Sequence, residues 1–499
     1  MKAILPEGFN LDTHCLTFPP LDYNFDNFNR DHALFILTQI TLVPVRNKDI
    51  ADQMQDSWTP LYSVLLRKVV HSYNDYLVYF EKTGVVNINK KYRPKIFFPD
   101  NPTSRVYRFT ETYTGCEVVQ VNYSKKFGNV LRKKRREEYQ SLQKEYGHLT
   151  KWLWPSCKLE IDGPKANEFL QLRRQAQIDI PSLRDTRRHP IYGTVEDKDP
   201  DVQYKHAQAN VNCLLSRDIG CTVDKTVGRM HTVLTNMKGD LRHLVTYAGE
   251  QLVSIDITNS QPYLSLMLFN PRVYSSKRRP PLASNEGAGR CKTNLIDIIS
   301  PSIGKEIRES PLMLLNLAQL SDNEDFKDYQ ALVSAKASST GPDIYTYMAK
   351  QSEEHFGIKF ADRNAVKVGM FEVLFSRNLY AGRTGVKKLF KELFPSVSLL
   401  FQQLKENDHT RLPCLLQSIE SYIMLKVITK AIAKKHPNIP LFTIHDSITT
   451  TARHVDTVKA IMEAELTRII GLPPKLKIEE WNPDNLDWDK YQLALMEIE

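Results

Sequence analysis

Two short β-branched stretches, each with a single carboxylate, constrain this chain more than any other feature. Residues 252–258 read Leu-Val-Ser-Ile-Asp-Ile-Thr and place Asp256 near the end of an apolar run. Residues 440–450 place Asp446 in the middle of a second such run. Runs of this kind predict buried strands, where a charge is costly unless it is paired or binds a metal. We therefore expect the two strands to bring Asp256 and Asp446 together around divalent cations.

A helix is predicted at 362–378, and one of its faces is unusual. Arg363, Lys367, Phe371 and Phe375 are each four residues apart, so a helix would place them along one stripe. Two cations followed by two aromatic rings suit a nucleoside triphosphate, because cations bind phosphates and rings can meet the base and sugar. Taken alone, the stripe fits equally well an amphipathic core helix with two snorkelling cations.

The composition is that of a soluble globular protein. With 499 residues the chain has room for two or three domains. No stretch is apolar for long enough to span a bilayer, and the N-terminus lacks a signal-peptide core, so we expect a cytoplasmic protein without membrane contact. The seven scattered cysteines contain no Cys-x-x-Cys pair, which argues against a disulfide framework and a zinc site. A net charge of +9 permits a polyanionic partner.

A run of positive charge precedes these motifs, within a stretch that looks helical. It includes four consecutive cations: Lys133, Lys134, Arg135 and Arg136. One interpretation is a contact with a nucleic-acid backbone. The other is a solvated helix face, which is the usual fate of such a run.

The order of these motifs resembles that of the A-family DNA polymerases, whose relatives include the single-subunit phage and mitochondrial RNA polymerases. Gly228-Arg229 comes first, then motif A near 252–263, motif B at 362–378 and motif C at 443–448. The Arg-x3-Lys-x3-Phe helix and the His-Asp turn are specific because both occur in the right order. The resemblance covers roughly residues 222–490. It implies an α+β right-hand polymerase with an antiparallel-sheet palm, helical fingers and a helical thumb-like region.

The resemblance also implies a division of the chain. Residues 1–110 would form an N-terminal domain whose role we do not assign. Residues 111–205 would form the thumb-like, basic and mainly helical region. Residues 206–499 would form the palm and fingers, which hold the three motifs.

The resemblance implies a role for each motif residue in primer extension. Two Mg²⁺ ions, with Mn²⁺ as a substitute, would be held by Asp256, Asp446 and the carbonyl of Ile257. The incoming triphosphate would meet Arg363, Lys367 and Tyr345, with Lys367 also stabilising the leaving pyrophosphate. Phe371 would lie beside the sugar and Phe375 at the templating position. The residues that match contacts to the primer–template duplex are Arg229, Gln417 and His445, beside the basic run.

In the DNA-polymerase members, a Glu shortly after the motif A Asp blocks the 2′-hydroxyl of a ribonucleotide. The residue at the matching position here would decide between deoxynucleotides and ribonucleotides. An ungapped alignment gives Gln261, whereas matching Ser260-Gln261 to the family's Ser-Gln gives Tyr263. Both side chains are bulky and favour deoxynucleotides. However, Phe375 replaces a Tyr found in both branches, and His-Asp-Ser looks more like the RNA-polymerase branch.

We therefore expect a template-directed nucleotidyltransferase, in first place a DNA polymerase without a proofreading exonuclease. Its partners would be a primer–template, with DNA favoured, and dNTPs or NTPs. A single-subunit-type DNA-directed RNA polymerase or a primase-like enzyme is the main alternative. A catalytically inactive nucleic-acid-binding relative and an unrelated two-metal nuclease are further alternatives. Template type, processivity, oligomeric state and biological setting stay open.

Overall fold

The structure is a computed structural model. It describes residues 1–47, 50, 58–89, 105–113, 117–188, 195–270, 295–300, 305, 310, 316–317, 319–334, 342–360, 363–382 and 384–496. Among these residues, no helix is both long enough and apolar enough to cross a membrane.

An antiparallel sheet at the centre of the molecule carries both acidic strands. Its order is β13-β14-β12-β11-β6, and β15 pairs with β12 outside that path. The strands are β6 (Leu159–Ile161), β11 (Val245–Tyr247), β12 (Glu250–Ile257), β13 (Phe442–Ile444), β14 (Ser447–Thr451) and β15 (Leu476–Glu480). Leu252, Val253, Ile255 and Ile257 are all buried, so both faces of β12 are covered. The expected α+β class with an antiparallel sheet is confirmed.

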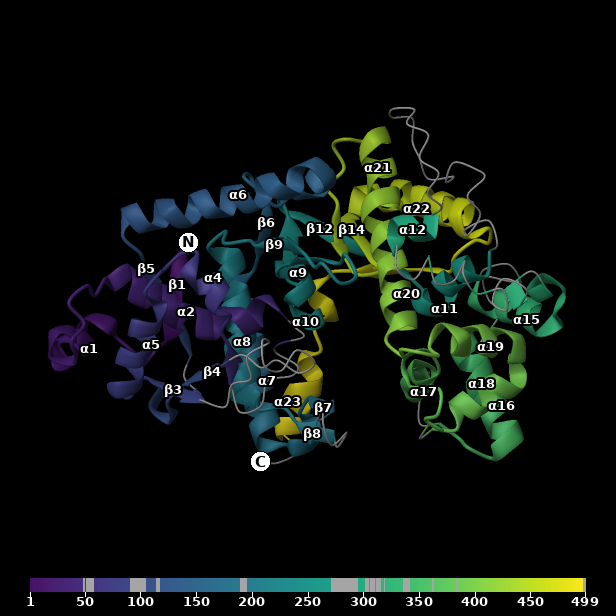
Figure 1. The fold of residues 1–499 in the computed structure, drawn as a ribbon, viewed down its shortest axis with the longest axis horizontal. Coiled ribbons are helices and arrows are strands. Elements are labelled where there is room, and N and C mark those ends of the chain that lie inside the picture. Colours follow the sequence, from purple (N-terminus) through teal and green to yellow (C-terminus); the bar gives the residue numbers. More distant parts are fainter. Residues whose placement is uncertain are drawn as a thin grey trace.

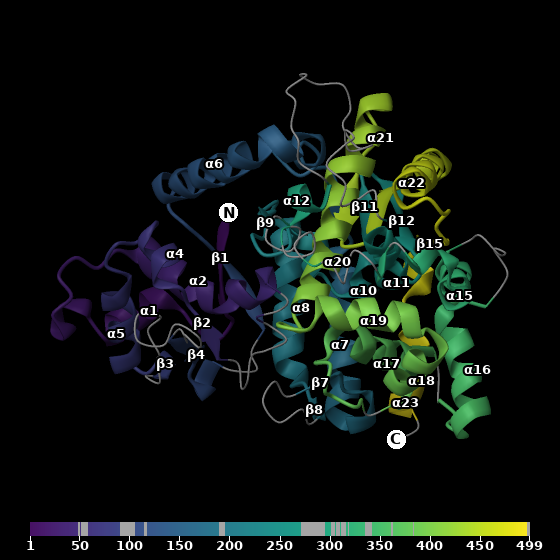
Figure 2. The same ribbon diagram turned by 45° about the vertical axis from the view of Figure 1, so that its right-hand side comes forward.

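A group of helices lies to one side of this sheet (Figures 1 and 2). It comprises α15 (Glu324–Val333), α16 (Ile344–Phe356), α17 (Arg363–Phe375), α18 (Val386–Leu393) and α19 (Pro395–Leu404). α18 packs closely on α17 because Gly369 has no side chain. A Cβ there would come within 2.5 Å of Val386 Cγ2.

An N-terminal group of elements lies on the other side of the sheet (Figure 1). Its own core cluster runs from Ala3 to Phe109. Its helices are α1 (Leu11–Thr17), α2 (Arg30–Arg46), α4 (Ser63–Arg67) and α5 (Tyr73–Lys82), and its strands are β1 (Lys2–Pro6), β2 (Thr59–Pro60), β3 (Val86–Asn89), β4 (Val106–Phe109) and β5 (Val118–Asn122). The domain boundaries near 110 and 205 stay predictions.

The long helix α6 (Lys125–Thr150) spans from the N-terminal group to the helices beyond the sheet (Figure 1). His148 near its end is hydrogen-bonded to the carbonyl of Leu425, at 3.1 Å. The elements that follow it are α7 (Gly163–Asp179), β7 (Thr186–Arg188), β8 (Val195–Asp197), α8 (Pro200–Leu215), β9 (Cys221–Val223), β10 (Met230–Thr232), α9 (Val233–Asn236) and α10 (Gly239–Arg242). Beyond β12 lie α11 (Ser260–Ser265), α12 (Leu295–Ile299), α20 (Arg411–Tyr422), the π-helix Ile423–Ile428, α21 (Thr429–Lys435), α22 (Val455–Ile470) and α23 (Trp488–Met496).

Candidate active site

The two predicted acids lie next to each other at the ends of paired strands. Asp256 on β12 lies opposite Ser447 on β14. Asp446 precedes Ser447 in the turn that joins β13 to β14, where Ile444 pairs with Ser447. Because directly opposite residues of an antiparallel pair are close neighbours, this register brings Asp256 beside the Asp446 turn. The structure therefore brings the two acids together as the sequence predicts.

The electrostatics of Asp256 reflect this crowding. Burial, together with the charges of Asp446 and Glu479, raises the pKa of Asp256 to about 6, while a hydrogen bond from Ser447 and the charge of Lys477 oppose the shift. A carboxylate that is both desolvated and close to like charges is destabilised in its ionised form. A bound cation would relieve that cost.

The donor set at this site suits Mg²⁺. Among the described residues, no group of three or more His, Cys, Asp and Glu side chains could hold a metal ion. Two carboxylates alone fit Mg²⁺, which commonly binds through one or two carboxylates together with substrate phosphates and waters. Ile257 follows Asp256 at the end of β12, and its role as a carbonyl ligand stays a prediction.

Two residues beside the acids have left-handed backbone conformations. His445, in the turn before Asp446, has a φ of +54°, and Asn259, after β12, has a φ of +55°. Such angles are uncommon for residues other than glycine and cost free energy, and they tend to occur at functional sites. The turns therefore give the ends of both acidic strands fixed, unusual shapes.

Arg363 reaches from α17 to the turn that follows β12. Its Nε donates to Asp343 Oδ2 at 3.0 Å, and its Nη2 donates to Asn259 Oδ1 at 3.0 Å. The guanidinium carbon lies 4.7 Å from the centroid of the Tyr345 ring. Tyr345 is buried and its ring packs against the Arg363 guanidinium, while its predicted contact with a triphosphate stays a prediction. Asp343 and Asn259 thus orient the first cation of the stripe.

The remaining residues of the stripe contact one another along α17. Lys367 Nζ lies 5.8 Å from the Phe371 centroid, and the Phe371 and Phe375 rings stack with centroids 5.3 Å apart. This geometry confirms the predicted stripe. The helix is shorter than the predicted 362–378: Asp362 lies outside the described residues, and α17 ends at Phe375.

The end of α17 is capped by a lysine side chain. The buried ammonium of Lys405 donates to the carbonyls of Val373, at 2.6 Å, and Ser376, at 3.2 Å. These bonds satisfy carbonyls of the last turn that have no partner within the helix. Burial lowers the pKa of Lys405 to about 8.

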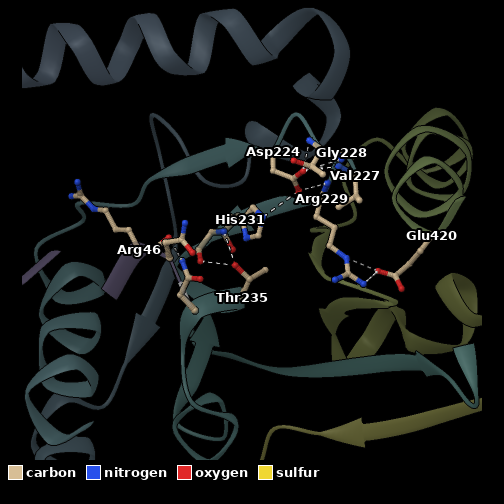
Figure 3. Close-up of polar contacts among 12 residues, drawn as sticks. Arg46, Asp224, Val227, Gly228, Arg229, His231, Thr235 and Glu420 are labelled. Carbon is tan, nitrogen blue, oxygen red and sulfur yellow. Dashed lines mark hydrogen bonds and ion pairs between the residues drawn. The ribbon is translucent and has the colours of Figure 1, made fainter. Parts of the chain in front are cut away.

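Arg229 is presented by a tight turn between β9 and β10 (Figure 3). The carboxylate of Asp224 accepts hydrogen bonds from the backbone N–H groups of residues 226–229, including Val227 at 2.7 Å and Arg229 at 2.8 Å. Gly228 allows the turn because its φ is +74°. The guanidinium of Arg229 then meets the carboxylate of Glu420 on α20 at 2.7 Å.

The two candidates for the sugar gate lie in different environments. Tyr263 is fully buried, and its hydroxyl donates to the carbonyl of Leu472 at 2.7 Å. The prediction that it could face a sugar is wrong, because its ring fills the core beneath α11. Gln261 is half-buried, and its Nε2 donates to Glu420 Oε2 at 2.6 Å. Gln261 is therefore the remaining candidate for the sugar gate, and that role stays a prediction.

The four cations of the basic run do not share one environment on α6. Lys133 and Arg136 are exposed, whereas the amine of Lys134 donates to the carbonyl of Lys68. Arg135 is 11% exposed and pairs with the buried Asp218 at 3.0 Å. The prediction that Arg135 contacts nucleic acid is wrong, because the ion pair with Asp218 holds the Arg135 side chain against the protein.

Several residues of the site were not found from the sequence. Asp343 and Asn259 orient Arg363, and Glu420 holds Arg229 and Gln261. Glu420 is three residues after the predicted duplex contact Gln417, on the same helix. That spacing, which places both on one helical face, was the one available signal.

Comparisons with known proteins give little further information. No family model and no curated protein matches the chain. A solved structure that the chain resembles is the POL domain of Pol1 from M. smegmatis, in complex with a DNA primer-template and dNTP. The identity is 11% and the TM-score 0.28, over 72% of this chain and 74% of that one. A likeness this weak carries no argument, so the case for a function rests on the site.

Proposed function

We propose that this protein is a template-directed nucleotidyltransferase of the A-family polymerase type, extending a primer with deoxynucleotides. The observation that supports it most is the adjacency of Asp256 and Asp446 on paired strands. A helix with exposed cations, α17, reaches this site through the bond from Arg363 to Asn259. The acids suit divalent cations and the cations suit a triphosphate. In this proposal the sheet is the palm, helices α15–α19 the fingers, and the region of α6 the thumb.

The residues of the chain divide the work in this proposal. Bound Mg²⁺ ions would activate the primer 3′-hydroxyl and neutralise the triphosphate. Asp256 and Asp446 would hold those ions. Arg363, already oriented by Asp343, binds phosphate oxygens, and Lys367 neutralises charge on the departing pyrophosphate. Arg229, Gln417 and His445 face the duplex end.

Primer extension tests the proposal directly. The purified chain would be given a labelled primer on a longer template, Mg²⁺ and either dNTPs or NTPs, with a chelated reaction as control. An Asp446→Asn preparation made in parallel excludes a contaminating polymerase. Extension with dNTPs supports the proposal, and extension with NTPs alone would replace it by RNA synthesis. Duplex binding without extension would favour an inactive relative, and cleavage would favour a nuclease.

Shortening Gln261 should relax sugar discrimination. Gln261→Ala opens space where a 2′-hydroxyl would sit, so ribonucleotide use should rise relative to deoxynucleotide use by roughly 1–3 kcal/mol in the ratio of kcat/KM values. Tyr263→Phe is the control. It should leave that ratio unchanged and lower the free energy of unfolding by about 1 kcal/mol through the lost bond to Leu472. A larger change of the ratio in Tyr263→Phe would contradict the gate assignment.

Removing exposed charge from α6 should weaken duplex binding. In a Lys133→Gln/Arg136→Gln variant, each lost phosphate contact should reduce the log–log salt slope of binding by roughly 0.9. Arg135→Ala is the contrasting variant, because it breaks the pair with Asp218 and should lower the free energy of unfolding by about 1.5–3 kcal/mol. An unchanged salt slope in the double variant would show that this face is only solvated.

A further inference from the structure

A buried carboxylate joins two of the residues that the proposed function uses. Glu420, on α20, has a side chain that is only 2% exposed. Its Oε1 accepts from Arg229 Nε at 3.0 Å and Nη2 at 2.7 Å, and its Oε2 accepts from Gln261 Nε2 at 2.6 Å. Figure 3 shows Arg229 and Glu420 facing each other from separate segments. One side chain thus fixes the turn after β9 to the first turn of α11.

This arrangement is expensive in free energy. Burial, together with the charge of Asp446, raises the pKa of Glu420 to about 7, although Arg229 opposes the shift. A buried ion pair contributes little net stability, because desolvation offsets most of its attraction. An apolar residue at position 420 would serve packing at least as well. The cost therefore points to a task other than stability.

The two partners of Glu420 depend on it for their positions. The other amide atom of Gln261, Oε1, is buried and has no hydrogen-bond partner among the described residues. Glu420 is therefore the group that sets the Gln261 rotamer. Arg229 uses Nε and Nη2 for the carboxylate, which fixes the plane of the guanidinium and leaves Nη1 outside this contact.

We propose that Glu420 is a positioning residue that couples duplex binding by Arg229 to sugar discrimination by Gln261. This inference rests on the proposed function. When Glu420 holds both side chains, Gln261 is already in the orientation that discriminates between sugars when the duplex end binds Arg229. Loss of the carboxylate charge releases both side chains together.

The test uses Glu420→Gln, which keeps shape and removes charge. We expect primer–template binding to weaken about tenfold and relative ribonucleotide use to rise about tenfold, the size expected for losing a charge-assisted hydrogen bond. Glu420→Asp, which keeps the charge, should restore part of both effects. Asp218→Asn, in the buried ion pair with Arg135, is the matched control: it should lower stability and leave the nucleotide preference unchanged.

Double variants separate positioning from a general loss of structure. If Glu420 acts through Gln261, then Glu420→Gln/Gln261→Ala should show the sugar preference of Gln261→Ala alone. The same should hold for duplex binding by Glu420→Gln/Arg229→Ala compared with Arg229→Ala. Additive effects, or an unchanged preference in Glu420→Gln, would overturn the inference while leaving polymerase activity of the wild type in place. A wild type that extends no primer would overturn the proposed function, and the inference with it.

Discussion

Replacing Asp256 or Asp446 with asparagine should abolish nucleotide addition while duplex binding persists. Each carboxylate would hold cations that stabilise charge in the transition state. Its loss should therefore raise the activation free energy by about 4 kcal/mol or more, which lowers the single-turnover rate roughly a thousandfold. Asparagine preserves the volume, and the pairing of β12 with β14 does not use these side chains. Rapid-quench primer extension at saturating dNTP measures the rate, and fluorescence anisotropy measures binding.

A second signature distinguishes an active-site acid from a structural one. The pKa of Asp256 is raised from 3.8 to about 6, so ionisation of this carboxyl destabilises the fold; the cost builds up between these two pH values and is complete above pH 6. Removing that charge in Asp256→Asn should therefore raise the metal-free free energy of unfolding at pH 7 by about 2 kcal/mol. The exposed Asp487→Asn is the control and should change neither property. Appreciable synthesis by both active-site variants would exclude the two-metal assignment.

The parts of the site that could be predicted from the sequence are those that local patterns determine. A β-branched run places Asp256 at the end of a buried strand whatever the rest of the chain does. Four-residue spacing places Lys367, Phe371 and Phe375 on one stripe because the helix has 3.6 residues per turn. Both predictions agree with the structure. They needed no knowledge of tertiary contacts.

The errors concern residues whose environment is set by distant segments. Tyr263 looked like a bulky gate, yet Leu472, more than two hundred residues away, accepts its hydroxyl and draws the ring into the core. Arg135 looked like one more surface cation, yet its side chain forms a largely buried ion pair with Asp218. A pattern along the chain gives a side chain's type and helical face. It does not give the partner that arrives from elsewhere.

The same reasoning explains why Glu420 and Asp343 were missed. Glu420 is an ordinary acid within a helix and Asp343 is an ordinary helix cap, and nothing in the local sequence marks the partner of either. Only the fold places Glu420 against Arg229 and Asp343 against Arg363. Sequence motifs thus indicated the residues that the proposed function places at the substrate. The acids that orient those residues became visible in the structure.

Replacing Lys367 with alanine should slow chemistry far more than it weakens folding. Lys367 is exposed on α17, and no described carboxylate lies within ion-pair distance of its amine, unlike Arg363, which Asp343 holds. Its charge is therefore available to the triphosphate. Loss of one preorganised charge at the leaving group should reduce kcat by roughly 10²–10³-fold. Stability should change by less than about 0.5 kcal/mol, as for ordinary surface substitutions.

The comparison of Lys367→Ala with a matched variant makes this prediction sharp. Lys388, an exposed lysine on the neighbouring helix α18, stands over the Phe356 ring at 5.1 Å, much as Lys367 stands over Phe371. Lys388→Ala removes the same charge and the same kind of ring contact away from Asp256 and Asp446, together with an exposed ion pair to Glu392 at 3.9 Å. It should leave kcat close to that of the wild type. Equal kinetics for the two variants at saturating dNTP would mean that α17 does not bind the triphosphate, and the stripe would return to the role of a core helix with solvated cations.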